Sequence, residues 1–208
     1  MEESSRTARA HSAGHELVAV ILLSLVAVLT AWCGFQSTKW GGDSSVAFSE
    51  ASAARIEASD DESEARDARM IDISVFTQWV IAGADDDPAL ADYIQERFSP
   101  ELTVAFDAWR ADGMVERGPF VMDEYVPPGT EEAAKKTTRA NELQATALEL
   151  NDKGDSYSLM TVLFALVLFL AAIAQRGISL LASRIVLGLA GTIALAGLVV
   201  LFTFPVRF

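Results

Sequence analysis

Apolar and polar residues alternate in long blocks along the chain, and three of the apolar blocks contain no charged residue. They cover residues 17–35, 157–174 and 185–205, which are 19, 18 and 21 residues long. A helix rises about 1.5 Å per residue, so roughly 20 residues cross the ~30 Å hydrocarbon core of a bilayer. The pattern predicts three transmembrane helices. Aromatic residues typical of membrane interfaces lie near the block ends: Trp32, Trp40, Tyr157, Phe202 and Phe204.

The first block could also be a signal that is removed after export. Trp32 stands before Cys33, where a lipoprotein signal needs a small residue, and no small-x-small cleavage site follows closely. We therefore expect residues 17–35 to be an uncleaved signal anchor.

Most of the charge lies between the first two blocks. Residues 36–155 contain 26 acidic and 11 basic residues, a net charge of −15. Residues 43–82 contain neither proline nor glycine, and Gly41 and Gly42 precede them. This favours one long helix after the glycine pair. Three consecutive residues are suited to be its N-cap: Asp43, Ser44 and Ser45.

Prolines and glycines divide the rest of this segment. Asp87 can cap a helix that begins at Pro88, and Ser99-Pro100 interrupts it before a helix at residues 101–111. Residues 113–129 then form a loop.

A second long helix follows the loop. We expect Thr130 to cap it and Glu131 and Glu132 to lie in its positive first turn. Its pattern continues toward the second apolar block, and Gly154 is the expected joint between the two.

Small residues recur at heptad spacing along both long helices, which allows close approach of the helix backbones. The first seam is Ala47, Ala51, Ala54, Ala58, Asp61, Ala65 and Ala68. The second is Ala133, Thr137, Ala140, Gln144, Ala147, Asn151, Gly154, Ser158, Thr161 and Ala165. The spacing predicts a long antiparallel helical hairpin of coiled-coil type. The alternative is a pore wall in a homo-oligomer, with Gln144, Asn151, Ser158 and Thr161 facing water.

Larger apolar residues gather where the middle of the segment can cover the hairpin. We predict an exterior core from Met70, Ile71, Ile73, Phe76, Trp79, Val80, Leu90, Tyr93, Ile94, Phe98, Leu102, Phe106 and Trp109. Trp79 and Trp109 could instead form a ligand platform. The apolar residues of the 113–129 loop, such as Phe120 and Tyr125, either pack on this core or form a contact surface.

Candidate chemistry is sparse. His11 and His15 both precede or border the first block, so the domain at 36–155 has no histidine for a triad or a zinc site. Residues Asp85–Asp87 could hold calcium, but capping of the next helix is the simpler interpretation. Cys33, the single cysteine, rules out an internal disulfide. We therefore predict no enzyme, no catalytic or metal site and no cofactor.

The amount of charge excludes nucleic-acid binding, and its position along the chain argues against a pump or secondary transporter. A chain with a net charge of −13 lacks the basic face that nucleic-acid binding needs. Pumps and secondary transporters usually place charged groups within their spans, and the three blocks have none.

Lys and Arg near the block ends set the expected orientation. Arg6, Arg9, Arg176 and Arg184 lie on one side and Lys39, Lys153 and Arg207 on the other, a majority of four to three. We predict a cytoplasmic tail at 1–16, a cytoplasmic turn at 175–184 and an extracytoplasmic acidic domain at 36–155.

Several stretches resemble those of an uncharacterised bacterial family of three-span membrane proteins. They read AWCGFQSTKWGG, EASAARIEAS, RFSPELTVAFDAW and YSLMTVLFALVLFLAAIA. The resemblance implies location in the bacterial cell (inner) membrane and supplies no activity or functional residue.

We therefore expect an all-α integral membrane protein that acts as a membrane-anchored helical scaffold or interaction protein. Its expected partners are the lipid bilayer, a second copy of the chain as a homo-oligomer, or another membrane or extracytoplasmic protein. The alternative function is a homo-oligomeric cation-selective channel, in which the acidic domain concentrates cations as a vestibule.

Overall fold

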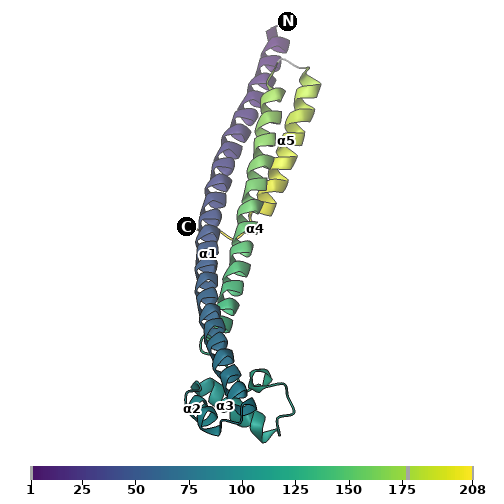
Figure 1. Cartoon of the computed structure of the whole chain (residues 1–208). Helices are drawn as coiled ribbons and strands as arrows, with labels where there is room; N and C mark the ends of the chain where they lie inside the picture. The colour runs from purple at the N-terminus through teal and green to yellow at the C-terminus, as the bar shows by residue number, and fades with distance from the viewer. Residues whose placement is uncertain (1, 177–178, 208) are drawn as a thin grey trace. The chain divides into compact units, whose positions relative to one another are not determined.

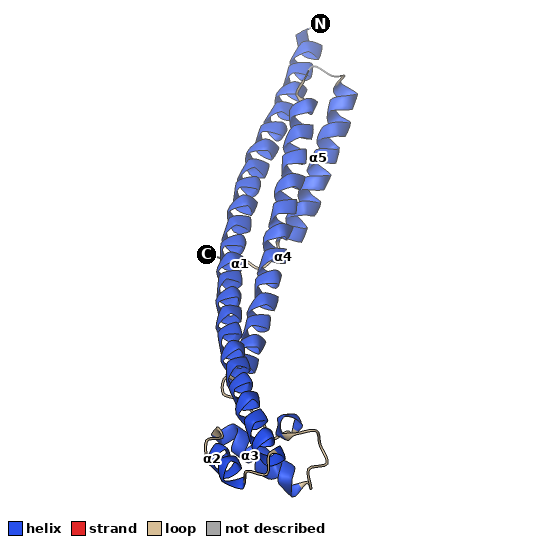
Figure 2. Cartoon of the chain, viewed as in Figure 1, coloured by secondary structure: helices blue, strands red, loops and turns tan. Residues whose placement is uncertain are grey.

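The structure is a computed structural model that describes the backbone of residues 2–176 and 179–207 and the side chains of residues 17–176, 179 and 181–207. This part of the chain consists of helices and loops without strands, so the predicted all-α class is confirmed (Figure 2). The helices are α1 (Glu2–Ala84), α2 (Pro88–Gln95), α3 (Pro100–Ala111), the 3-10 turn η1 (Pro119–Val121), α4 (Thr130–Ala174) and α5 (Leu180–Leu201).

Three helices, α1, α4 and α5, each contain a stretch long and apolar enough to cross a membrane, which fits a multi-pass membrane protein. Some residues of the two segments that are predicted to be cytoplasmic lie outside the described part of the chain. The side chains of the predicted 1–16 tail, including Arg6, Arg9, His11 and His15, lie outside the described residues, as do residues 177–178 of the predicted 175–184 turn.

The chain folds as two compact units, and α1 and α4 contribute to both. Residues up to Phe48 and from Gln144 onward form one unit, which we call the three-helix unit. Residues Ser49–Leu143 form the other, which we call the acidic unit because acidic residues outnumber basic ones in it.

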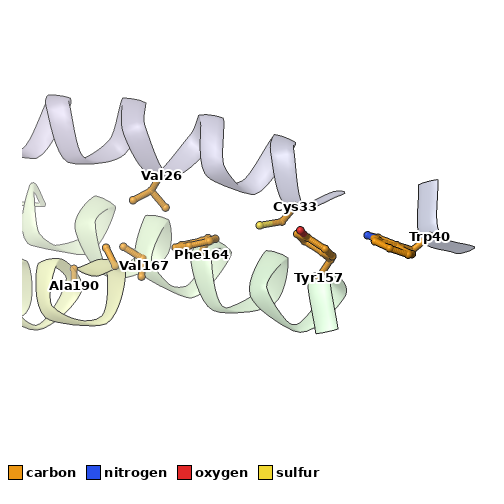
Figure 3. Close-up of a cluster of buried hydrophobic side chains, with 8 residues drawn as sticks. Val26, Cys33, Trp40, Tyr157, Phe164, Val167 and Ala190 are labelled. Atoms are coloured by element: carbon orange, nitrogen blue, oxygen red, sulfur yellow. The ribbon is translucent and has the colours of Figure 1, made fainter. Parts of the chain in front are cut away.

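In the three-helix unit α1, α4 and α5 lie side by side (Figure 1). Ser37 Oγ lies 2.8 Å from Ser158 Oγ, and Ser44 Oγ donates to Ala147 O at 2.9 Å, so α1 and α4 are antiparallel here. Ser183 Oγ of α5 donates to Ala174 O at the end of α4, at 2.6 Å. Figure 3 shows the core between the helices, where Val26, Cys33, Trp40, Tyr157, Phe164, Val167 and Ala190 are buried.

Two predicted interruptions in this unit are wrong, because both long helices continue through their glycines. α1 runs through Gly41 and Gly42, so none of Asp43, Ser44 and Ser45 is an N-cap. Ser45 Oγ donates back to Gly41 O at 2.9 Å instead. Each glycine weakens a helix by ~1 kcal/mol, and burial of neighbouring residues against α4 offsets this.

Gly154 is a contact point and not a joint. α4 passes through it without a break. A Cβ at this position would lie 3.4 Å from Ser37 O and 3.5 Å from Gly41 N. The glycine therefore marks a place where α4 comes close to the backbone of α1.

In the acidic unit, the local signals at α2 and α3 are confirmed. Asp87 caps α2 by accepting from Leu90 N at 3.0 Å, and Ser99 caps α3 by accepting from Leu102 N at 3.0 Å. The start of α4 differs by one residue from the prediction. Thr130 is its first helical residue. Ala133 N donates to Gly129 O at 2.9 Å, so Gly129 and not Thr130 occupies the N-cap position.

Gly129 fits where no other residue does. Its φ is +84°, in the left-handed region, and a Cβ there would lie 2.5 Å from Asp61 O of α1. The loop therefore passes directly against the α1 backbone as it enters α4.

The α1 seam is confirmed. Ala47, Ala51, Ala54 and Ala58 are buried, and Asp61, Ala65 and Ala68 are half-buried. On α4 every second predicted position is right: Ala133, Ala140, Ala147 and Gly154 are buried. Of the positions between them, Thr137, Asn151, Ser158 and Ala165 are exposed. The residues one place earlier face inward instead: Lys136, Leu143, Leu150, Tyr157 and Phe164.

Candidate functional site

A buried carboxylate joins three elements of the acidic unit. Asp72 of α1 is 5% exposed and is the only buried charged side chain among the residues with described side chains. Its Oδ2 accepts from Ser99 Oγ and from Tyr125 OH, each at 2.9 Å. Ser99 caps α3 and Tyr125 belongs to the loop, so Asp72 fixes both against α1.

Tyr125 is buried beside this carboxylate. Burial first, and then the hydrogen bond to Asp72, raise the pKa of the Tyr125 phenol well above its usual range. The tyrosine is therefore a neutral hydrogen-bond donor to Asp72 at physiological pH.

An aromatic cluster lies next to the hydrogen-bonded group of Asp72, Ser99 and Tyr125 and forms the core of the acidic unit. Its rings meet mostly edge to face, for example Phe76 with Phe120 at 5.5 Å and Trp79 with Phe106 at 4.9 Å between centroids. Trp109 Nε1 donates to Glu116 O at 2.8 Å. Trp79 and Trp109 thus both pack within the core cluster, as the first interpretation predicted.

One part of the 113–129 loop packs on the core and another part is exposed, so each of the two roles considered from the sequence applies to a part of the loop. Pro119 and Tyr125 are buried, and Phe120 packs on Phe76, so this part belongs to the core. Other apolar residues of the loop are exposed: Met114, Val115, Val121 and Val126.

The predicted exterior core is wrong at several positions, which lie on the surface. The exposed residues are Met70, Ile71, Ile73, Val80, Leu90 and Tyr93. Four apolar residues of α1, which we call the α1 apolar face, fall within about 100° around the helix axis at 3.6 residues per turn. They are Met70, Ile73, Val80 and Ile81, and the buried Asp72 lies on the opposite side of the helix.

An interhelical ion pair stands in the seam of the acidic unit. Lys136 Nζ of α4 lies 2.9 Å from Asp61 Oδ2 and 3.8 Å from Glu57 Oε2 of α1. The contact with Asp61 raises the pKa of Lys136. Asp61, the one acidic residue in the predicted alanine seam, therefore accommodates a lysine at a core-facing position.

In the three-helix unit, the segment after α5 folds onto α1 and α4. We call residues 202–207 the strap. Gln36 is fully buried and forms a reciprocal pair with Arg207: Gln36 Nε2 donates to Arg207 O at 2.7 Å, and Arg207 N donates to Gln36 Oε1 at 3.0 Å. Tyr157 OH donates to Pro205 O at 2.9 Å.

The strap's basic residue is also held from the side. Arg207 Nε lies 3.4 Å from Asp43 Oδ2, and the guanidinium lies 4.9 Å from the centre of the Trp40 ring. Lys153 Nζ lies 5.1 Å from the same ring. Two cations therefore converge on one buried tryptophan at the end of the unit.

Sequence reasoning missed both Asp72 and Gln36. Asp72 continues the α1 seam, four residues after Ala68, and Gln36 lies four residues before the buried Trp40. The sequence signal that could have identified both residues is a single polar residue at helical spacing from buried apolar ones.

The triple aspartate Asp85–Asp87 is a turn, in which Asp87 caps α2 and Asp86 adopts a φ of 54°. No group of three or more His, Cys, Asp or Glu within the described residues is arranged to hold a metal ion. Comparison with known proteins gives no further guide to function, because the chain matches no family model, no curated protein and no solved structure.

Proposed function

We propose that the chain is a membrane-anchored helical scaffold of the bacterial cell membrane, with its acidic unit as an extracytoplasmic interaction module. The observation that carries this proposal is the α1 apolar face. Four large apolar residues stay exposed on α1, although the aromatic core lies on the other side of the same helix. An apolar face of this kind on a charged unit is typical of an interaction surface.

We further propose that α1 and α4 form one long antiparallel hairpin through both units. The two helices contact each other within each unit, at Ser37–Ser158 in one and at Lys136–Asp61 in the other.

We propose self-association as the first use of the α1 apolar face. The homo-oligomeric channel is the alternative function, since two of its proposed water-facing residues, Asn151 and Ser158, are exposed, although each also bonds within the chain. Ser158 pairs with Ser37, and Asn151 Nδ2 donates to Asp155 Oδ2 at 3.0 Å.

Cysteine crosslinking in native membranes tests this function. In a Cys33→Ala background, Ile73→Cys and Val80→Cys should form disulfide-linked dimers under mild oxidation if the face joins two copies. Thr138→Cys, at an exposed position of α4, is the matched control and should stay monomeric. Equal dimer yields at all three positions would remove the support for a specific face, and crosslinks to a different protein would make that protein the partner.

A further inference from the structure

An apolar cavity of about 300 Å³ lies in the three-helix unit, between the spans and the strap. Its walls come from α1, α4, α5 and the strap and carry no charged side chain. The principal lining residues are Leu29, Trp32, Tyr157, Leu198, Leu201 and Phe204.

The strap forms one wall of this cavity, which the helices alone would leave as an open groove. Phe204 of the strap packs edge to face on Tyr157, with ring centres 5.2 Å apart. The Gln36–Arg207 pair and the Tyr157–Pro205 hydrogen bond fix the backbone of the strap behind this ring. The wall is therefore formed before any ligand arrives, as in most ligand sites.

The size and surroundings of the cavity restrict its occupant. Ligand pockets typically measure roughly 300–1,000 Å³, so this one is at the lower end. Five of its lining residues, Leu29, Trp32, Tyr157, Leu198 and Leu201, belong to helices apolar enough to cross a membrane. A stretch of one hydrocarbon chain from the surrounding bilayer fits such a space, whereas a complete lipid exceeds it.

A positive charge stands beyond the aromatic end of the cavity. The exposed Lys39 follows Trp32 by seven residues, which is two turns and about 10 Å along the same side of α1. Phe35, half exposed, packs at 5.9 Å from Trp32 between them. Aromatic residues followed by lysine at the end of an apolar membrane-spanning stretch are typical anchors at the headgroup level.

We propose that this cavity binds one acyl chain of an anionic phospholipid, with the headgroup phosphate beside Lys39. The proposal rests on the membrane insertion proposed above. The strap closes the site on one side, and Gln36 and Tyr157 position the strap.

The test uses the full chain in vesicles of phosphatidylcholine that contain phosphatidylglycerol with a photoreactive diazirine on one acyl chain. After illumination, mass spectrometry locates the labelled residues. We expect labelling concentrated on Leu29, Trp32, Leu198 and Leu201. The variant Leu201→Trp fills the cavity and should lose most of this labelling. Its matched control is Val199→Trp, which adds the same side chain at an exposed position of α5 and should retain it.

Two more variants test the strap and the charge. Gln36→Leu releases Arg207 and should lower labelling of the cavity residues while circular dichroism shows unchanged helix content. Lys39→Gln should reduce the preference for phosphatidylglycerol over phosphatidylcholine probes by about fivefold, the value of one basic residue at a membrane surface.

Labelling of the exposed residues Leu195 and Val199 reports membrane insertion by itself. If these residues are labelled as strongly as the cavity residues, or if Leu201→Trp changes nothing, the lipid site is refuted while insertion stands. If no apolar residue of α1, α4 or α5 is labelled, membrane insertion itself is refuted.

Discussion

At the scale of single residues, a few positions accept one kind of side chain only. Gly129 combines a left-handed backbone with a backbone atom of α1 within 2.5 Å of the Cβ position. Gly113 has a similar φ of +75° but nothing within 4 Å of that position. The two glycines therefore separate backbone strain from steric contact.

We expect Gly129→Ala to lower the free energy of unfolding of the acidic unit more than Gly113→Ala does. Gly113→Ala should cost about 1–2 kcal/mol for the left-handed conformation alone. Gly129→Ala adds overpacking of ~1–3 kcal/mol. Urea unfolding followed by tryptophan fluorescence measures both. Equal losses would mean that the loop moves away from Asp61 at little cost.

The Asp72–Tyr125 hydrogen bond makes the stability of the acidic unit depend on alkaline pH. Because the pKa of Tyr125 is raised in the folded state, its contribution is complete below the unfolded value of about 10 and is lost as pH rises through the folded value. Tyr125→Phe should cost ~1.5–3 kcal/mol at neutral pH, since a hydrogen bond to a charged group is lost. The difference between wild type and variant should shrink above about pH 10.

The matched control for this pH dependence is Tyr93→Phe. Tyr93 is exposed, and its ring lies under Arg97 at 3.4 Å. Its removal should change the free energy of unfolding little at any pH. If the difference between wild type and Tyr125→Phe stays constant across the alkaline range, the buried phenol does not titrate with unfolding.

At the scale of elements, the starts of the two short helices α2 and α3 could be predicted from sequence, and the face that each long helix buries only in part. Asp87 and Ser99 lie directly before prolines, so local chemistry alone places the starts of α2 and α3. The glycine pair in α1 misled because packing with α4 outweighs helix propensity, and packing depends on residues far away in the sequence.

The phase error on α4 has a physical cause at each end. Residue size favours Thr137 over Lys136 in a close seam, but Asp61 lies opposite and pairs with the lysine. In the three-helix unit, Tyr157 and Phe164 face inward where Ser158 and Ala165 were expected. The third helix provides partners for large side chains there, since Phe164 belongs to the same buried cluster as Ala190 and Ala194 of α5.

The corrected phase predicts that the same substitution changes the free energy of unfolding differently at two positions of α4 that lie three residues apart. Ala140→Leu adds bulk at a fully buried seam position and should cost ~1–3 kcal/mol by overpacking. Thr137→Leu, at an exposed position, should leave the free energy of unfolding nearly unchanged. Thermal unfolding by circular dichroism compares them. A larger loss for Thr137→Leu would restore the original seam.

At the scale of the whole molecule, the arrangement in a membrane is a prediction from charge. Single cysteines at Ser59 and Ser179, both exposed, report the two sides in a Cys33→Ala background. An impermeant maleimide applied to spheroplasts should label Ser59→Cys and spare Ser179→Cys until the cells are lysed. The reverse pattern would place the acidic unit in the cytoplasm, and the four-to-three majority of basic residues would then have misled.

The buried pairing of Gln36 with Arg207 also sets an order of events in synthesis. The two residues are 171 positions apart, which is about 10–30 s of translation at typical rates of roughly 5–20 residues per second. During this interval the Gln36 amide, which follows the first predicted span directly, lacks its final partners, and an unpaired amide is costly away from water. A chain that stops before residue 207 therefore keeps this polar group without its partners, and we expect such a chain to be degraded faster than one that includes Arg207.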